Sequence, residues 1–476
     1  MKSVAQILSL LWILLAGVVR AEPPSLAVTH VTVIDPATAS TRPNQTLMIS
    51  GNRITQISEA PPPKDAKIIE GKGKFLIPGL CDMHVHLAGV TADPRWSRDT
   101  LLPLLVANGI TTVRDMGGDF AAVQDRRKAI QSGRIVGPRI YSPGPMLDGG
   151  QSDPPALRAV NSPDEARSAV RDLKEKGVDF IKVLSRLDRE SYFAIADEAK
   201  KQKITFVGHV PSSVTAIEAS NAGQKSIEHI FYSDLTFDCS TREMALRGQA
   251  AAARAGHDSA AAGAVRDEAN ASFSEEKAKS VWQKLVQNHT WVVPTLVAIH
   301  TIAHQRDIAQ SHPTELAYLP KKLRQNWSVE EIEKQVSPEA AKWYQGQFEN
   351  DLKLAKSMHA AGVQMMAGSD SLDPLNVPGR SLHEELQFLT QAGLTPMEAL
   401  QAATSSPAEF LRANKEWGTI QSGRIADLVL LDANPLEAIV NTKKISAVID
   451  GGKLFDRGAL DAMLAQARSA ADQASE

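Results

Sequence analysis

Two histidines, His84 and His86, stand two residues apart in a largely apolar stretch at residues 75–86. Side chains two apart on a β-strand point to the same face. Two imidazoles on one buried face can bind one metal ion, because imidazole is a common ligand of divalent metals. A pair of packed core histidines is the simpler explanation if the pattern stands alone. The chain must therefore be searched for further ligands.

Lys182 lies at the centre of an apolar strand predicted over residues 179–184. Lysine is rarely buried without a partner, and burial lowers its pKa towards that of a neutral amine. A neutral amine can react with carbon dioxide to form a carbamate, an anionic ligand able to bridge two cations. The alternative is a lysine at a strand end that points into solvent.

Three more residues able to bind a metal come at the ends of predicted strands. His209 ends the strand at residues 205–209, His229 the strand at 226–229, and Asp370 the strand at 363–370. Each alone is explained equally well as a core histidine or a helix-capping aspartate. Their shared position at strand ends, together with Lys182, favours one common site.

Strands and helices alternate through the middle of the chain. Helices are predicted at residues 164–175, 189–201 and 213–222, among others. This alternation predicts the α/β class and a (β/α)8 TIM-like barrel, in which the strand ends carry the chemistry. The eight predicted strands are residues 75–86, 111–115, 139–142, 179–184, 205–209, 226–229, 291–294 and 363–370.

Both ends of the chain have short strands with turn residues, which predicts a small β-sandwich built from both termini. An alanine-rich stretch after the sixth strand is predicted to be a helical insertion, either a lid or a solvated excursion. The predicted divisions are a signal peptide at 1–21, sandwich parts at 22–74 and 418–460, a barrel at 75–417 with its insertion at 241–276, and a C-terminal tail at 461–476.

The first residues have the pattern of a secretory signal. Lys2 precedes an apolar run at residues 7–19 that is short for a membrane span, and Val19-Arg20-Ala21 offers a cleavage site. We therefore expect a periplasmic or secreted protein, with no membrane association after cleavage; a retained anchor is the alternative. The net charge of −3 argues against a nucleic-acid partner.

The ligand candidates and several other motifs resemble one known family. The further motifs are residues 109–118 (GITTVRDMGG), Pro294-Thr295-Leu296, and residues 393–404 (GLTPMEALQAAT). With them the chain resembles, from about residue 25 to residue 455, the amidohydrolase superfamily. The similarity is to its binuclear group with a carboxylated lysine, in the imidazolonepropionase-like and prolidase-like branch.

The resemblance implies two divalent ions, with zinc as the expected metal, and a hydroxide as second bridge. Two such cations activate water and polarise a scissile carbonyl. Asp370 would accept the proton of the water and pass it to the leaving nitrogen. The implied ligands are His84, His86 and Asp370 on the more buried ion, His209 and His229 on the other, and carboxylated Lys182 between them.

Tyr141, Arg186 and Tyr232 follow predicted strands and are candidates for substrate binding. Arg114 and Asp115 are candidates for support of the site, and a structural salt bridge is the alternative. The expected substrate is a small amide with a carboxylate near the scissile bond, such as a dipeptide or an N-acyl amino acid. Many peptidase members of the branch carry a second histidine just after the fifth-strand ligand, where this chain has Val210 and Pro211.

Two other functions compete with amide hydrolysis. A one-metal deaminase or imidazolone-type ring hydrolase needs no lysine on the fourth strand, so Lys182 counts against it. A binding protein on an inactive amidohydrolase frame would have lost ligands, whereas all six positions are filled. The expected partner is a small-molecule amide, and a homo-oligomer is left open.

Overall fold

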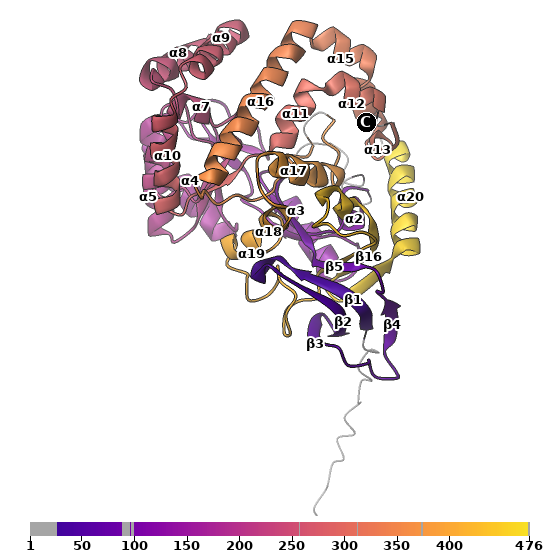
Figure 1. Ribbon diagram of the computed structural model, residues 1–476. Coiled ribbons are helices and arrows are strands. Elements are labelled where there is room, and N and C mark those ends of the chain that lie inside the picture. Colours follow the sequence, from indigo (N-terminus) through magenta and orange to yellow (C-terminus); the bar gives the residue numbers. More distant parts are fainter. Residues whose placement is uncertain are drawn as a thin grey trace, which may run out of the picture.

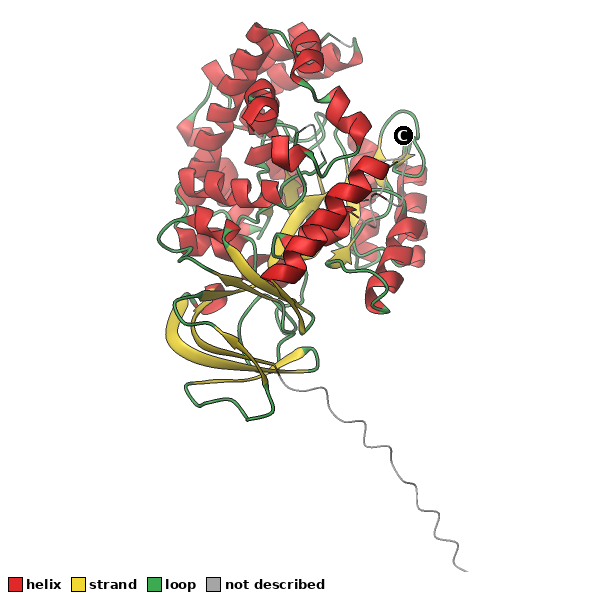
Figure 2. Ribbon diagram, turned by 90° about the vertical axis from the view of Figure 1, so that its right-hand side faces the viewer, coloured by secondary structure: helices red, strands yellow, loops and turns green. Residues whose placement is uncertain are grey.

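The computed structural model describes residues 26–87, 96, 100–256, 258–311, 313–372 and 375–474. The predicted signal at residues 1–21 lies outside the described residues. Within the described part the chain is of the α/β class, with a helix-rich body and a separate curled sheet beside it (Figure 2). No helix of the described residues is both long enough and apolar enough to cross a bilayer.

The curled sheet is assembled from both ends of the chain. Its strand order is β17-β16-β15-β5-β1-β2-β3, with β4 paired to β1, and the two ends meet where β5 pairs antiparallel with β15. Its apolar inner face holds a hydrophobic cluster of its own. The strands are β1 (Leu26–Asp35), β2 (Ser40–Ser50), β3 (Arg53–Ser58), β4 (Lys67–Glu70), β5 (Phe75–Pro78), β15 (Leu428–Leu431), β16 (Ile445–Asp450) and β17 (Lys453–Asp456).

The body contains two parallel sheets, one in the order β6-β7-β8 and one in the order β10-β9-β11-β12-β13-β14. Single parallel bridges join them through one segment, from Val292 to Met365 and from Val85 to Ser371. The strands are β6 (Leu80–Val85), β7 (Ile110–Asp115), β8 (Arg139–Tyr141), β9 (Met146–Asp148), β10 (Leu157–Ala159), β11 (Ile181–Val183), β12 (Phe206–Gly208), β13 (Ser226–Glu228) and β14 (Trp291–Val293).

The strand predicted at residues 363–370 is wrong as a continuous strand, because only the bridges at Met365 and Ser371 are formed. Gly368 lies so close to β14 that a Cβ there would come within 2.6 Å of a Val293 methyl group. Asp370 then adopts a left-handed conformation, with φ of 55°. The segment exchanges backbone hydrogen bonds with β14 at residues 364 and 366, and with β6 and the residue just after it at residues 367, 370 and 371. It forms no regular ladder with either strand, and the turn at Asp370 ends the pleat.

The helices begin and end where local capping signals stand. In α4 (Pro163–Lys176), the Ser162 side chain accepts from the backbone N–H of Glu165, proline takes the first turn, and Gly177 ends the helix in a left-handed conformation. Its buried residues recur at helical spacing and face the core: Ala166, Ala169, Val170 and Leu173.

The remaining helices cover the sheets or follow them in the chain (Figure 1). They are α2 (Leu102–Ala107), α3 (Phe120–Gln131), α5 (Arg189–Lys201), α6 (Ala216–Asn221), α7 (Leu235–Asp238), α8 (Glu243–Ala255), α9 (Ser259–Ala271), α10 (Glu275–Gln287), α11 (Leu296–Ala303), α12 (Gln305–Ser311), α13 (Pro313–Leu316), α14 (Lys321–Asn326), α15 (Val329–Gln335), α16 (Pro338–Ala360), α17 (Arg380–Gln391), α18 (Pro396–Ala402), α19 (Ser405–Phe410) and α20 (Arg457–Gln473), with short 3₁₀ helices at Pro36–Thr38 and Ile439–Lys443.

Two further segments of the chain, the predicted insertion and the C-terminal residues, are helical. Residues 241–276 contain the helix pair α8 and α9, which stands beyond α7 in Figure 1. The last residues, predicted as a tail, form α20, which buries Leu460, Ala467 and Ala471. The Thr100 hydroxyl donates to the Ala467 carbonyl at 3.2 Å, so α20 is fastened to the region of α2.

Candidate active site

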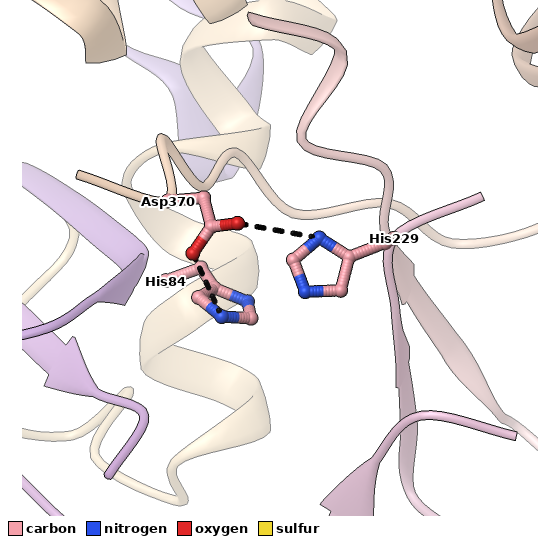
Figure 3. Close-up of side chains that lie close together, drawn as sticks. All are labelled: His84, His229 and Asp370. Atoms are coloured by element: carbon pink, nitrogen blue, oxygen red, sulfur yellow. Dashed lines mark ion pairs between the residues drawn. The ribbon is translucent and has the colours of Figure 1, made fainter. Parts of the chain in front are cut away.

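The carboxylate of Asp370 contacts three histidines, His84 and His86 at the end of β6 and His229 after β13. Its Oδ1 lies 3.4 Å from Nε2 of both His84 and His86, and its Oδ2 lies 3.7 Å from Nδ1 of His229. Figure 3 shows the Asp370 carboxylate between the rings of His84 and His229. One ligand atom each from His84, His229 and Asp370 lie within 4.8 Å of one another, close enough to hold one metal ion.

Backbone geometry fixes this arrangement. His229 and Asp370 both have positive φ, 63° and 55°, which for residues other than glycine is uncommon and often found at functional sites. The His229 N–H donates to the Val293 carbonyl at 2.8 Å, and the Asp370 N–H donates to the His84 carbonyl at 2.7 Å. The turn conformations are therefore held by β14 and β6.

His209 follows β12 and adjoins the same cluster, its ring centroid 4.9 Å from that of His229. Gly208, just before it, has φ of 136°, and a Cβ there would lie 2.1 Å from the Val183 carbonyl oxygen. Only glycine fits this close approach of β12 to β11. The glycine thus lets His209 end its strand beside the neighbouring strand that carries Lys182.

Lys182 is buried at the centre of β11, with 1% of its surface exposed. Burial lowers the pKa of its ammonium group to about 8, although the charges of Glu228 and Asp370 oppose the shift. The neutral amine is therefore far more populated at neutral pH than for a lysine in water. The charges of Glu228 and Asp370 act on the Lys182 ammonium group, so Lys182 is electrostatically linked to the cluster.

The protonation of the buried groups suits metal binding, which needs neutral imidazole and ionised carboxylate. Burial lowers the pKa of His84 to about 4, and lowers those of His209 and His229 well below the usual histidine value. Burial opposes ionisation of Asp370, yet the neighbouring imidazoles and a hydrogen bond from His86 hold its pKa well below the usual range.

Hydrogen-bond contacts orient the rings of the buried histidines. The Thr295 hydroxyl donates to the Pro294 carbonyl at 2.8 Å, which leaves Thr295 Oγ1 as an acceptor for His229 Nδ1, 2.7 Å away. His209 Nδ1 lies 2.7 Å from Ser185 Oγ. Both rings can therefore keep the lone pair of Nε2 for a metal.

His84 completes this pattern. Its Nδ1 lies 3.0 Å from Glu228 Oε2, whereas its buried Nε2 has no hydrogen-bond partner in the described part of the chain. Burial favours the neutral form of Glu228, but the Arg114 guanidinium holds its pKa well below the usual range. The ionised Glu228 must therefore accept from Nδ1–H, which leaves the Nε2 lone pair of His84 free beside Asp370. This donor set fits a divalent metal ion.

Two buried carboxylates in the support of the site were not predicted from the sequence. Both carboxylate oxygens of Glu228 accept a hydrogen bond from Arg114 Nη2, at 2.8 and 2.7 Å. Asp82 accepts from the backbone N–H of Ser369 at 2.9 Å and from that of His84 at 3.2 Å. An acidic residue within each apolar strand was the available signal, because a buried charge needs a partner.

Arg114 supports the site as predicted, through its bonds to Glu228. Among the described residues, Asp115 has hydrogen-bond partners other than Arg114. Asp115 accepts from the backbone N–H of Leu87 at 2.8 Å and from the Ser142 hydroxyl at 2.7 Å. It therefore fixes the end of β6, just beyond His86. The two candidates act on different parts of the site.

The three substrate candidates differ in position. The ring of Tyr232 stacks on His209 at 6.3 Å and meets His229 edge-on at 5.0 Å. Arg186 is 59% exposed and bonded through Nε to Asp148 at 2.7 Å. Tyr141 packs against the apolar cluster of Met116, Phe180 and Val207, and none of its described contacts is with a candidate metal ligand. Only Tyr232 is brought to the cluster directly.

Comparisons with known proteins agree with this geometry. The Amidohydrolase family model matches residues 75–455. The chain is 26% identical over 441 residues to ochratoxinase of Aspergillus niger, covering 80% of this chain and 75% of that protein. It is 31% identical over 120 residues to imidazolonepropionase of Shouchella clausii, covering 22% of this chain and 25% of that protein.

Solved structures share the fold. The structure of bottromycin amidohydrolase matches with a TM-score of 0.71 and 23% identity, covering 95% of this chain and 91% of that one. A Xaa-Pro dipeptidase with bound methionine in the active site matches with a TM-score of 0.66 and 21% identity, covering 91% of this chain and all of that one, 100%.

Replacing Glu228 by glutamine should weaken metal binding about 10- to 100-fold, the usual effect of losing a residue that orients a metal-bound histidine. The amide can turn its NH₂ group towards His84 and no longer fixes the tautomer. Titration against a competing chelator measures the dissociation constant. Glu416→Gln, at an exposed ion pair with Arg53, is the matched control. An unchanged affinity in Glu228→Gln would contradict this role.

Proposed function

Because this chain belongs to the amidohydrolase family and is a metal-binding hydrolase of carbon–nitrogen bonds, we propose that it cleaves small amides that carry a carboxylate near the scissile bond. Dipeptides and N-acyl amino acids are the expected substrates. The observation that carries the proposal is the gathering of His84, His229 and Asp370, with the lone pair of His84 Nε2 unpaired in a buried site.

The proposed cofactors are two divalent ions, with zinc as the expected metal. His84, His86 and Asp370 would hold one, and His209 and His229 the other. When bound, the ions would supply an activated water at neutral pH and polarise the scissile carbonyl. The neutral imidazoles support this assignment, because zinc is commonly bound by histidine nitrogen and carboxylate oxygen together.

Lys182 is proposed to carry a carbamate that joins the two ligand groups. Its lowered pKa of about 8 supports the reaction with carbon dioxide, since only the neutral amine is a nucleophile. The nitrogen attacks the carbon of carbon dioxide, loses a proton and becomes an anionic carbamate. Its position on β11, next to the strand of His209, supports this role.

Asp370 is proposed as the proton carrier of the reaction. As an ionised carboxylate it can accept a proton from the attacking water and later donate it to the nitrogen of the leaving amine. The carbon–nitrogen bond breaks as the new carbon–oxygen bond forms, so a carboxylic acid and an amine result. The 3.4 Å contacts of Asp370 Oδ1 with Nε2 of His84 and of His86 support a fixed orientation for this transfer.

We also infer that the two parallel sheets form one closed (β/α)8 barrel. The bridges of Met365 and Ser371 support closure on one side. On the other, the Asp179 N–H donates to the Ser142 carbonyl at 3.0 Å, between the ends of β8 and β11. In such a barrel the ligands lie at the carboxyl ends of the strands, where active sites of this fold are built.

Export to the periplasm or medium is proposed from the leader pattern at residues 1–21 alone. N-terminal sequencing of the mature protein from each fraction checks it. A mature chain that begins at Glu22 is expected. A chain recovered with its leader intact and bound to membranes would contradict it.

Asp370→Asn should lower kcat about 10²- to 10⁴-fold, because an amide cannot carry the proton. Rates are compared at equal metal content, measured by elemental analysis, since Asp370 is also a proposed ligand. Asp197→Asn, at an exposed aspartate, is the control. A loss of less than tenfold at full metal content would show that the proton takes another route.

Lys182→Ala should lose most activity, and its metal content should fall from about two ions per chain. Short carboxylic acids added with bicarbonate should restore part of both, because they can take the place of the carbamate. Lys200→Ala, on the exposed face of α5, is the control. Two bound ions and wild-type turnover in Lys182→Ala would rule out the carbamate.

The substrate class is tested with pairs of free-acid dipeptides and their C-terminal amides. We expect kcat/KM to be at least about tenfold higher for the free acids, because only their carboxylate can form a charge-assisted hydrogen bond with the enzyme. Arg186→Gln should remove the preference, because its exposed guanidinium, anchored by Asp148, is the proposed carboxylate contact. Equal kcat/KM for both members, or activity on lactones and esters only, would contradict the proposal.

A further inference from the structure

The helix pair α8–α9 is fastened to the segment after β13 by two buried ion pairs. Arg266 of α9 donates from Nη2 to Asp234 Oδ1 at 2.7 Å, and Arg247 of α8 donates from Nη2 to Asp238 Oδ2 at 2.6 Å. The four side chains are at most 8% exposed. Asp234 and Asp238 bracket the single turn α7, so each helix of the pair holds one end of it.

Arg266 also covers the residue next to Tyr232. Its guanidinium lies 4.0 Å from the ring centroid of Phe231, a distance that allows a cation–π interaction. Two residues of α16, Trp343 and Tyr344, also contact Phe231, with ring centroids 6.1 and 6.2 Å away. Phe231 is thus in contact with both α9 and α16.

Tyr232 is the one residue of this segment whose ring meets the imidazoles of His209 and His229. Its neighbours Phe231 and Asp234 are held by Arg266. A change in the position of α9 must therefore affect the Tyr232 ring, because only one residue, Ser233, separates Tyr232 from Asp234.

Buried ion pairs are poor choices for stability alone, because desolvation of two charges offsets most of their attraction. Here the cost is higher, since buried nitrogens of both Arg247 and Arg266 have no hydrogen-bond partner among the described residues. Apolar side chains would fasten the helices as firmly. What directed ion pairs add is a defined position.

We propose that the α8–α9 pair is a clamp that positions Tyr232 against the metal-site histidines, with Arg266 as its positioning residue. The clamp comprises α8 (Glu243–Ala255) and α9 (Ser259–Ala271). The inference rests on the proposed function and on the expectation from the sequence that Tyr232 binds the substrate. It gives the insertion a role in substrate binding rather than that of a mobile cover.

The first test is a double-mutant cycle between Arg266 and Tyr232, with kcat and KM measured separately. Arg266→Met should raise KM about 10- to 100-fold, with kcat changed less than about threefold and metal content unchanged. In a Tyr232→Phe or Tyr232→Ala background, the same substitution should have less than about a twofold further effect. Equal effects of Arg266→Met in all backgrounds would overturn the proposal.

The control is Arg242→Met, which removes an arginine of the same insertion that pairs with Glu268 at the exposed surface. It should leave KM as in the wild type. If Arg266→Met does not fold, Arg266→Lys serves instead, because lysine keeps the charge and loses the planar contact with Phe231. It should raise KM in the same direction, and a wild-type KM in a folded Arg266→Lys would overturn the proposal.

Hydrogen exchange followed by mass spectrometry tests the clamp without any substrate. Amides of residues 230–238 should exchange faster in the Arg266 variants and at the wild-type rate in Arg242→Met. If the wild-type protein hydrolyses no amide substrate, the proposed function is wrong, but the exchange measurement still tests whether the α8–α9 pair positions residues 230–238. Wild-type exchange over 230–238 in the Arg266 variants would overturn it.

Discussion

The buried guanidinium of Arg114 is the contact on which the rest of the site depends. From β7 it donates to the Met83 carbonyl of β6 at 2.7 Å, to the Ser226 hydroxyl of β13 at 3.0 Å and to the Glu228 carboxylate. One planar fork of donors therefore ties three strands together. Because Glu228 in turn holds Nδ1 of His84, the orientation of a metal ligand follows from the same contact.

A second carboxylate, Asp82, does for Asp370 what Glu228 does for His84. It accepts from both the backbone N–H and the hydroxyl of Ser369, at 2.9 and 2.6 Å, and so fixes the turn that presents Asp370. That turn replaces regular strand pairing at residues 363–370. The regular ladder is interrupted where Asp370, in a left-handed conformation, directs its carboxylate towards the imidazoles of His84 and His86. Such uncommon backbone conformations are frequent at functional sites.

The chain is a metal-binding hydrolase of the amidohydrolase family, and its buried side chains set the geometry of the candidate site. The imidazoles are kept neutral by burial and oriented by Glu228, Ser185 and Thr295. Two structural devices surround this centre. Backbone contacts between strands fix the candidate ligands, and the α8–α9 pair contacts the aromatic segment after β13. Both sets of contacts restrict movement around the candidate site.

The sequence by itself determined the α/β class, the family and which side chains can bind metal, because these follow from local patterns: period-two spacing at His84 and His86, and strand ends at His209 and His229. Glu228 and Asp82 escaped prediction, since their partners lie on other strands and depend on sheet register. The same holds for the turn at Asp370, for the contact of α9 with Asp234, and for Tyr141, which the fold directs to an apolar cluster. Non-local pairing decides these, and no local period encodes it.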